Sequence, residues 1–222
     1  MVFILTNIER KKVIQFFIKK IIYMYIMICN FKNIKDIVKK EGLNLLVVSY
    51  GGSISNTLVY EMEKNNYKCR TTTWEKILCH CPRYIDLDIP IIYIYDNPIK
   101  AFMSMKNRGN GYWDVNQQKL SNNTNVPLSD ENLMKLMINQ FKSWADIKRS
   151  NVLVIKSSEL FQHTIVSKLE NFLKNKINYF PIQYNNPKTN INSIFNEELN
   201  KLFEKYKLKI DKINNFITTN LV

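Results

Sequence analysis

The chain contains little glycine, histidine or cysteine, and each shortage narrows the range of structures or chemistries that the chain can have. Five glycines in 222 residues are too few for a low-complexity chain. Two histidines leave few side chains that can serve as a general base near neutral pH. Four cysteines, with no signal-peptide cleavage pattern at the start, favour reduced thiols in the cytoplasm.

The cysteines form no recognisable metal-binding or disulfide pattern. Cys79 and Cys81 are separated by one residue, which is too close for an ordinary mutual disulfide. A zinc set can be drawn from Cys69, Cys79, His80 and Cys81, but the Cys-His-Cys run lacks the spacing of structural zinc sites. We therefore predict no bound metal.

No apolar run is long enough to cross a membrane without interruption. Residues 13–31 are largely apolar, but Lys19 and Lys20 divide them into two pieces that are too short to span a bilayer. We predict that residues 1–30 form an apolar and basic helix, or an extension, that lies on the domain or on a membrane surface. The predicted location is cytoplasmic, and the alternative is weak membrane association through this N-terminal segment.

Positive charge is in excess and is spread along the chain. There are 32 lysines and arginines against 19 acidic residues, which gives a net charge of +13 and a pI of about 9.5. Heavy use of Lys, Asn and Ile is typical of an AT-rich genome, so part of this charge reflects composition. Because no basic block stands out, we expect a phosphate-rich small ligand rather than a nucleic acid.

Short apolar segments alternate with amphipathic ones along most of the chain. This alternation, with 45% hydrophobic residues, predicts a single α/β domain over residues 31–222. The expected fold is a three-layer, P-loop-type parallel sheet with helices on both faces, and ligands bind such sheets at the carboxyl ends of the strands. The expected strands cover residues 43–49, 67–72, 89–95 and 152–156.

A glycine- and serine-rich turn follows the first of these strands. Gly51 and Gly52 allow positive φ and close approach of a ligand, while Ser53, Ser55 and Asn56 add side-chain donors. The turn opens a predicted helix, and the N–H groups at a helix start attract anions. The pattern indicates an anion-binding loop, although a turn of this composition can also be structural, with a serine capping the helix.

Two further segments strengthen this interpretation. The second runs from a buried strand into Asp96-Asn97-Pro98, a typical helix start, and the third places a helix before another apolar strand. In this order along the chain, the segments Ser49–Leu58, Tyr93–Ser104 and Asn151–Leu160 resemble those of the sulfotransferases that use 3′-phosphoadenosine 5′-phosphosulfate (PAPS). The likeness spans roughly residues 43–174.

The resemblance implies an enzyme that moves a sulfuryl group from PAPS to a hydroxyl or amine of an acceptor that the sequence does not identify. In the family, the loop that matches residues 51–56 binds the 5′-phosphosulfate, and the serine that matches Ser104 binds the 3′-phosphate. The family's catalytic base matches His80, within His80-x-Pro82, or Glu75 in the manner of Golgi-type members. The resemblance implies no metal.

Three more residues are candidate cofactor contacts because of their chemistry. Lys100 and Arg108 lie close to Ser104 in the sequence and are candidate cations for the phosphates. Trp113 stands in a long loop over residues 108–128, beside two glycines, and is a candidate stacking partner for adenine or a sugar.

The chain departs from the family where the family carries positive charge. Gly52 stands in place of a Lys or Arg, Leu78 in place of a lysine near the base, and Asp96 in place of the arginine that holds the 3′-phosphate. An acidic group there repels a phosphate dianion. The alternative is therefore a degenerate sulfotransferase fold that acts as a non-catalytic binding or scaffold module. A P-loop phosphotransferase is disfavoured because no Gly-Lys-Ser/Thr run follows the glycines.

Overall fold

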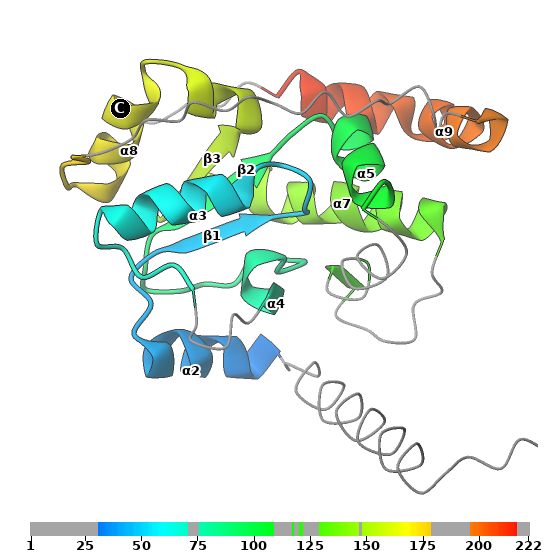
Figure 1. The fold of residues 1–222 in the computed structure, drawn as a ribbon. Coiled ribbons are helices and arrows are strands. Elements are labelled where there is room, and N and C mark those ends of the chain that lie inside the picture. The colour runs from blue at the N-terminus through cyan, green and yellow to red at the C-terminus, as the bar shows by residue number, and fades with distance from the viewer. Residues whose placement is uncertain are drawn as a thin grey trace, which may run out of the picture.

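A computed structural model gives the fold of the chain (Figure 1). The structure describes residues 31–70, 76–108, 117, 120–121, 129–146, 148–178 and 196–216. The segment expected over residues 1–30 lies outside these residues. None of the described helices combines the length and the apolar character that crossing a membrane requires.

Three parallel strands form the centre of the fold. They are β1 (Leu46–Ser49), β2 (Ile91–Tyr95) and β3 (Val152–Lys156), in the order β1-β2-β3. Both strand pairs are parallel. Every residue of β1 and β2 is buried, as expected for strands covered on both faces. The prediction of an α/β fold with a parallel sheet is confirmed.

The strand expected over residues 67–72 is not formed in the part that the structure describes. Residues 67–70 are irregular, and residues 71–72 lie outside the described ranges. The backbone N–H of Tyr67 turns back to the carbonyl of Met62, and the N–H of Lys68 donates to the side chain of Asn44. The first of these bonds ends helix α3 (Ser55–Lys64), and Lys68 pairs with the single residue Asn44, whose N–H donates to the Lys68 carbonyl, instead of with a strand.

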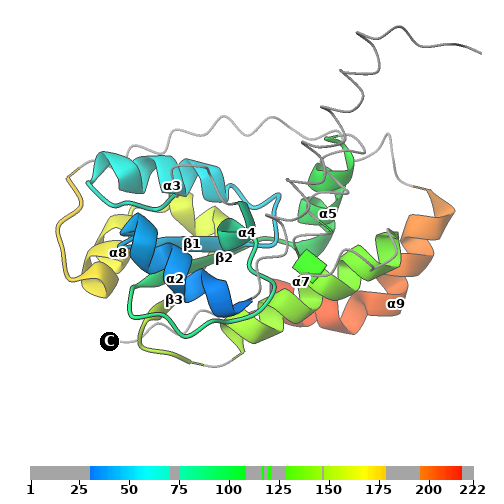
Figure 2. The same cartoon turned by 90° about the horizontal axis from the view of Figure 1, so that it is seen from below.

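Successive strand residues point to opposite faces of the sheet, and each face is covered by helices. Leu45 and Val47 pack with Ile92 and Ile94 under α3 and α8 (Ile165–Leu173). The opposite face packs against α2 (Phe31–Glu41) and α7 (Asp130–Ala145). Figure 2 shows the sheet between α3 on one side and α7 on the other.

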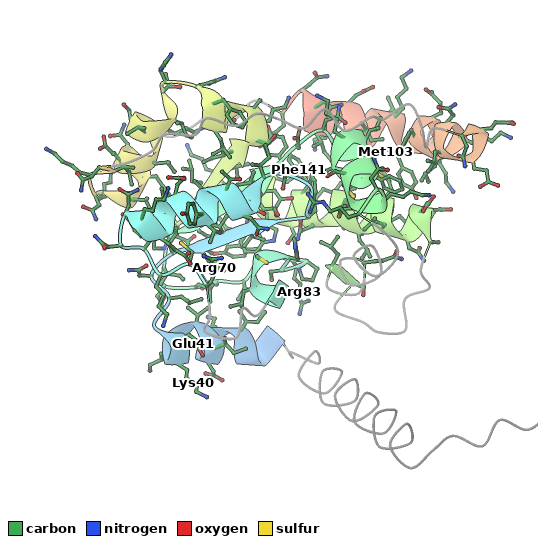
Figure 3. All side chains as sticks on the ribbon, viewed as in Figure 1. Lys40, Glu41, Arg70, Arg83, Met103 and Phe141 are labelled. Atoms are coloured by element: carbon green, nitrogen blue, oxygen red, sulfur yellow. The ribbon has the colours of Figure 1, made fainter. Side chains whose placement is uncertain are left out.

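A second group of helices packs beside the carboxyl ends of the strands. This group consists of α5 (Pro98–Lys106), α7 and α9 (Glu197–Asn214). The rings of Phe102 on α5 and Phe203 on α9 meet edge to face, with centroids 5.5 Å apart. Met103 of α5 and Phe141 of α7 belong to the same core (Figure 3).

The remaining elements are short. Helix α4 (Lys76–Cys79) packs against β1, and the 3-10 helix η1 (Ser157–Phe161) follows β3 directly. In Figure 1, α4 lies beneath β1, and the arrow of β1 points toward α5. The loop after β1 is therefore placed between α4 and the group of helices around α5.

Capping side chains distinguish the helix starts. Asn97 caps α5, Asn196 caps α9, and Ser129 caps α7, each by accepting a backbone N–H. Helix α3 starts after Ile54 without a side-chain cap. Helix α8 likewise starts, after Thr164, without a side-chain cap. The helix that follows the glycine-rich loop thus lacks the side-chain acceptor that α5, α7 and α9 have, which leaves room for an external anion there.

Candidate functional site

The loop between β1 and α3 has an unusual backbone. Gly51, Gly52 and Ile54 all have positive φ, at 94°, 66° and 64°. Glycine adopts this conformation freely, but for a β-branched residue such as Ile54 it costs about 1–2 kcal/mol. The surrounding structure therefore holds the loop in a conformation that its own sequence disfavours.

The serine hydroxyls in and beside the loop differ in their hydrogen bonds. Ser49 donates to Ser55 over 3.0 Å, and the Ser49 hydroxyl accepts from the N–H of Gly51 over 3.3 Å. Ser53 is fully buried, and its hydroxyl has no hydrogen-bond partner among the residues that the structure describes. A buried hydroxyl without a partner costs about 1–3 kcal/mol, so this group suits a ligand oxygen. Asn56 is exposed at the start of α3.

Gly52 cannot carry a side chain in this fold. A Cβ atom added there would lie 2.6 Å from the carbonyl oxygen of Ala101 in α5, closer than real Cβ contacts allow. The backbone contact between the loop and α5 therefore leaves no room for a cation at this position. A Lys or Arg in this place would push the two elements apart.

Three of the predicted contacts lie on helix α5 or directly after it. Lys100 and Ser104 are one turn apart on the helix, and Arg108 continues this stripe in the turn after the last helical residue, Lys106. Lys100 and Arg108 are exposed, Ser104 is half-buried, and the guanidinium of Arg108 lies 3.5 Å from the Ser104 hydroxyl. The stripe is adjacent to Ala101, the residue that touches the loop. Lys106, the last residue of α5, forms an ion pair with Asp130 of α7.

Asp96 takes part in the turn that joins β2 to α5. Its carboxylate accepts the N–H of Asn97 over 2.6 Å, and its own N–H donates to the hydroxyl of Tyr50 over 2.8 Å. The same hydroxyl donates to the carbonyl of Asp96. Burial raises the pKa of Tyr50 well above its ordinary value, so the phenol keeps its proton and ties the ends of β1 and β2 together.

His80 lies at the end of β1. Its Nδ1 atom is 2.8 Å from the carbonyl oxygen of Ser49, two residues before Gly51. A carbonyl oxygen only accepts hydrogen bonds, so Nδ1 carries the hydrogen, and Nε2 is the basic nitrogen of the neutral ring. The side chain is half-buried. The structure thus places His80, one of the two predicted catalytic bases, beside the start of the predicted anion-binding loop.

Two residues of α7 hydrogen-bond to the backbone beside this region, and the sequence analysis assigned a polar contact to neither. Gln140 is fully buried and donates to the carbonyls of Ser49, over 3.3 Å, and Cys81, over 2.8 Å. Trp144, one turn further along, donates to the carbonyl of Cys81 over 3.0 Å. The available signal was an amide on the apolar stripe of an amphipathic helix, because a buried amide requires polar partners.

Two predicted site residues lie outside the described ranges. They are Glu75, the alternative base, and Trp113, the stacking candidate. The first immediately precedes α4, and the second belongs to the segment between α5 and α7. His80 is the candidate base that the structure places.

The cysteines that a zinc site would need do not come together. Cys69 packs on the face of the sheet covered by α3, and Cys81 packs on the opposite face. Burial raises the pKa of each thiol to about 12, which disfavours the thiolate form that binds metals. Among the described residues, no three His, Cys, Asp or Glu side chains are grouped so that they could hold a metal ion.

Comparisons with protein-family models, with curated proteins and with solved structures give no match for the chain. The chemistry of the site is therefore taken from its residues. The loop offers backbone N–H groups and a buried hydroxyl, His80 offers a basic nitrogen, and α5 offers cations on the adjacent stripe. Donors and a base in this arrangement suit the transfer of an anionic group to an acceptor that loses a proton.

The contact between Gly52 and Ala101 can be tested against a matched glycine. Gly42 has nearly the same φ, +65°, but a Cβ atom there would meet nothing within 4 Å. We expect Gly42→Ala to lower the free energy of unfolding by about 1 kcal/mol, the cost of the left-handed conformation. Gly52→Ala should cost at least about 2 kcal/mol more because of overpacking. Equal losses in urea denaturation would contradict the close approach.

The left-handed conformation of Ile54 predicts that two substitutions there have the reverse of their usual order of stability. Ile54→Ala and Ile54→Gly both remove the side chain, but only glycine adopts φ of 64° without strain. We expect Ile54→Gly to be more stable than Ile54→Ala by about 1 kcal/mol, although glycine is normally the less stable of the two by about 0.5–1 kcal/mol. Chemical denaturation of both variants decides this, and the normal order would show that the position is not left-handed.

Proposed function

We propose that the chain is a PAPS-dependent, sulfotransferase-like protein that moves a sulfuryl group to a hydroxyl or amine acceptor. The observation that carries the proposal is the buried, unpartnered hydroxyl of Ser53 in the loop between β1 and the uncapped start of α3. This loop lies at the carboxyl end of a parallel strand, where ligands bind in sheets of this kind.

In the proposed reaction, each residue has a defined task. The loop and the Ser53 hydroxyl hold the 5′-phosphosulfate by donating hydrogen bonds to its oxygens. Nε2 of His80 takes the proton of the acceptor hydroxyl or amine as that atom forms a bond to sulfur. The bond between sulfur and the bridging oxygen breaks, and 3′-phosphoadenosine 5′-phosphate (PAP) leaves with the electron pair. Lys100, Ser104 and Arg108 are proposed contacts of the 3′-phosphate.

A second function within the same fold is favoured by the charges of the loop. Gly52 leaves no room for a cation, and the carboxylate of Asp96 is held in the turn where the family has an arginine. Both features weaken the attraction for a nucleotide that carries several negative charges. The alternative is a binding or scaffold module without catalysis. Binding of PAP distinguishes the two functions.

The first test measures PAP binding and stability together. Ser53→Ala removes a donor to the anion and should weaken PAP binding about 10- to 100-fold, since hydrogen bonds to charged groups contribute about 1.5–3 kcal/mol. The free variant should be as stable as the wild type or more stable, because an unpartnered buried hydroxyl is removed.

Ser49→Ala is the contrasting variant, since that hydroxyl already has two partners and its loss should lower the melting temperature. Calorimetric titration with PAP, with ATP for comparison, gives the affinities. Equal affinity of the wild type and Ser53→Ala for PAP would contradict the assignment of the loop. Failure of the wild type to bind PAP would leave the scaffold function.

The second test concerns the proposed base. His80→Ala should lower sulfuryl transfer by roughly two to four orders of magnitude while PAP affinity changes by less than about twofold, because only proton transfer is lost. The exposed His163 of the turn before α8 provides a control whose replacement by Ala should leave the rate unchanged. Full activity of His80→Ala, with loss of activity in Glu75→Ala, would assign the base to Glu75 instead.

A further inference from the structure

The amide of Gln140 joins three separate parts of the chain. The side chain lies in the fully buried stripe of α7. Its Nε2 group donates to the carbonyl that ends β1, at Ser49, and to the carbonyl of Cys81. Its Oε1 atom accepts from the hydroxyl of Tyr93 in β2 over 3.4 Å. Both hydrogens and the oxygen of this amide are therefore engaged, which fixes its orientation.

Gln140 and His80 bind the same oxygen atom. The Ser49 carbonyl accepts from Nδ1 of His80 over 2.8 Å and from Gln140 over 3.3 Å. The other hydrogen of the amide holds the carbonyl of Cys81, the residue that follows His80. The Gln140 amide thus connects two carbonyls. One is that of Ser49, which accepts the hydrogen bond of the imidazole, and the other is that of Cys81, in the backbone next to His80.

We propose that Gln140 is a positioning residue for His80. By bonding the carbonyls of Ser49 and Cys81, it holds the imidazole at the end of β1 with Nδ1 protonated and Nε2 as the basic nitrogen. This inference rests on the proposed role of His80 as the base. It adds a residue on a distant helix that sets the direction in which that base accepts a proton.

Trp144 separates this positioning role from a structural one. Its indole N–H donates to the Cys81 carbonyl, so among the described residues it shares one of the two carbonyls that Gln140 holds, and its N–H does not bond the carbonyl of Ser49. If the polar groups of α7 served only to fix the backbone at Cys81, Gln140 and Trp144 would be equivalent. The positioning role requires that the bond to the Ser49 carbonyl, which Gln140 makes and Trp144 does not, controls the ring.

The experiment compares Gln140→Met with Trp144→Phe in the full chain. Nitrogen-15 NMR of the labelled imidazole reports which ring nitrogen carries the hydrogen, and it requires no activity. In the wild type we expect the Nδ1–H tautomer. Gln140→Met should give a mixture of tautomers, and Trp144→Phe should keep the Nδ1–H form. Gln140→Asn, whose amide is one methylene shorter, should shift the tautomers in the same direction if Gln140→Met does not fold.

Kinetics supply the second readout. Gln140→Met should lower kcat for sulfuryl transfer about 10- to 100-fold while the KM for PAPS changes less than about twofold, and Trp144→Phe should change neither by more than about twofold. An unchanged tautomer in Gln140→Met, or the same change in both variants, would overturn the positioning role. If the wild type transfers no sulfuryl group, the proposed function fails, and the tautomers alone decide whether Gln140 positions the ring.

Discussion

The backbone contact between Gly52 and Ala101 determines how the rest of the site is arranged. It brings the loop after β1 against α5, with no side chain between them. The stripe that begins at Lys100 is thereby fixed next to the loop, and the loop must use positive φ to make the approach. The same contact leaves no room for a side chain, and therefore for a cation, at position 52. The positive φ angles of the loop and the absence of a cation at position 52 thus both follow from the close contact between Gly52 and Ala101.

Because of this constraint, the loop can attract an anion only through neutral donors. Backbone N–H groups at an uncapped helix start and the buried Ser53 hydroxyl are such donors. Positive charge is available one element away, where Lys100 on α5 and Arg108 in the turn after it are exposed. Exposed cations are screened by water and salt, so their contribution is smaller than that of a cation within the loop. Within the proposed function, affinity for the nucleotide should therefore fall as the salt concentration rises.

The sequence was sufficient for the sheet but insufficient for the polar contacts around it. Continuous apolar runs identified β1, β2 and β3 because strands covered on both faces contain little else. The strand expected over residues 67–72 is absent at its described end because Tyr67 and Lys68 bond instead to Met62 and Asn44. The role of Gln140 depends on which carbonyls lie opposite it in space, and periodicity contains no such information.

The energetically unfavourable features of the site also bear on the choice between the two proposed functions. An unpartnered Ser53 costs about 1–3 kcal/mol and a left-handed Ile54 about 1–2 kcal/mol, against a total stability of about 5–15 kcal/mol for a domain. A scaffold would gain stability by replacing these residues, and an apolar residue at position 140 would spare it a buried polar network. Within the proposed catalysis, the Ser53 hydroxyl would bind the anion and the Gln140 amide would hold the imidazole, whereas Ile54 has no assigned part. The unpartnered hydroxyl and the buried amide are therefore the two features that favour the proposed catalysis over the proposed scaffold.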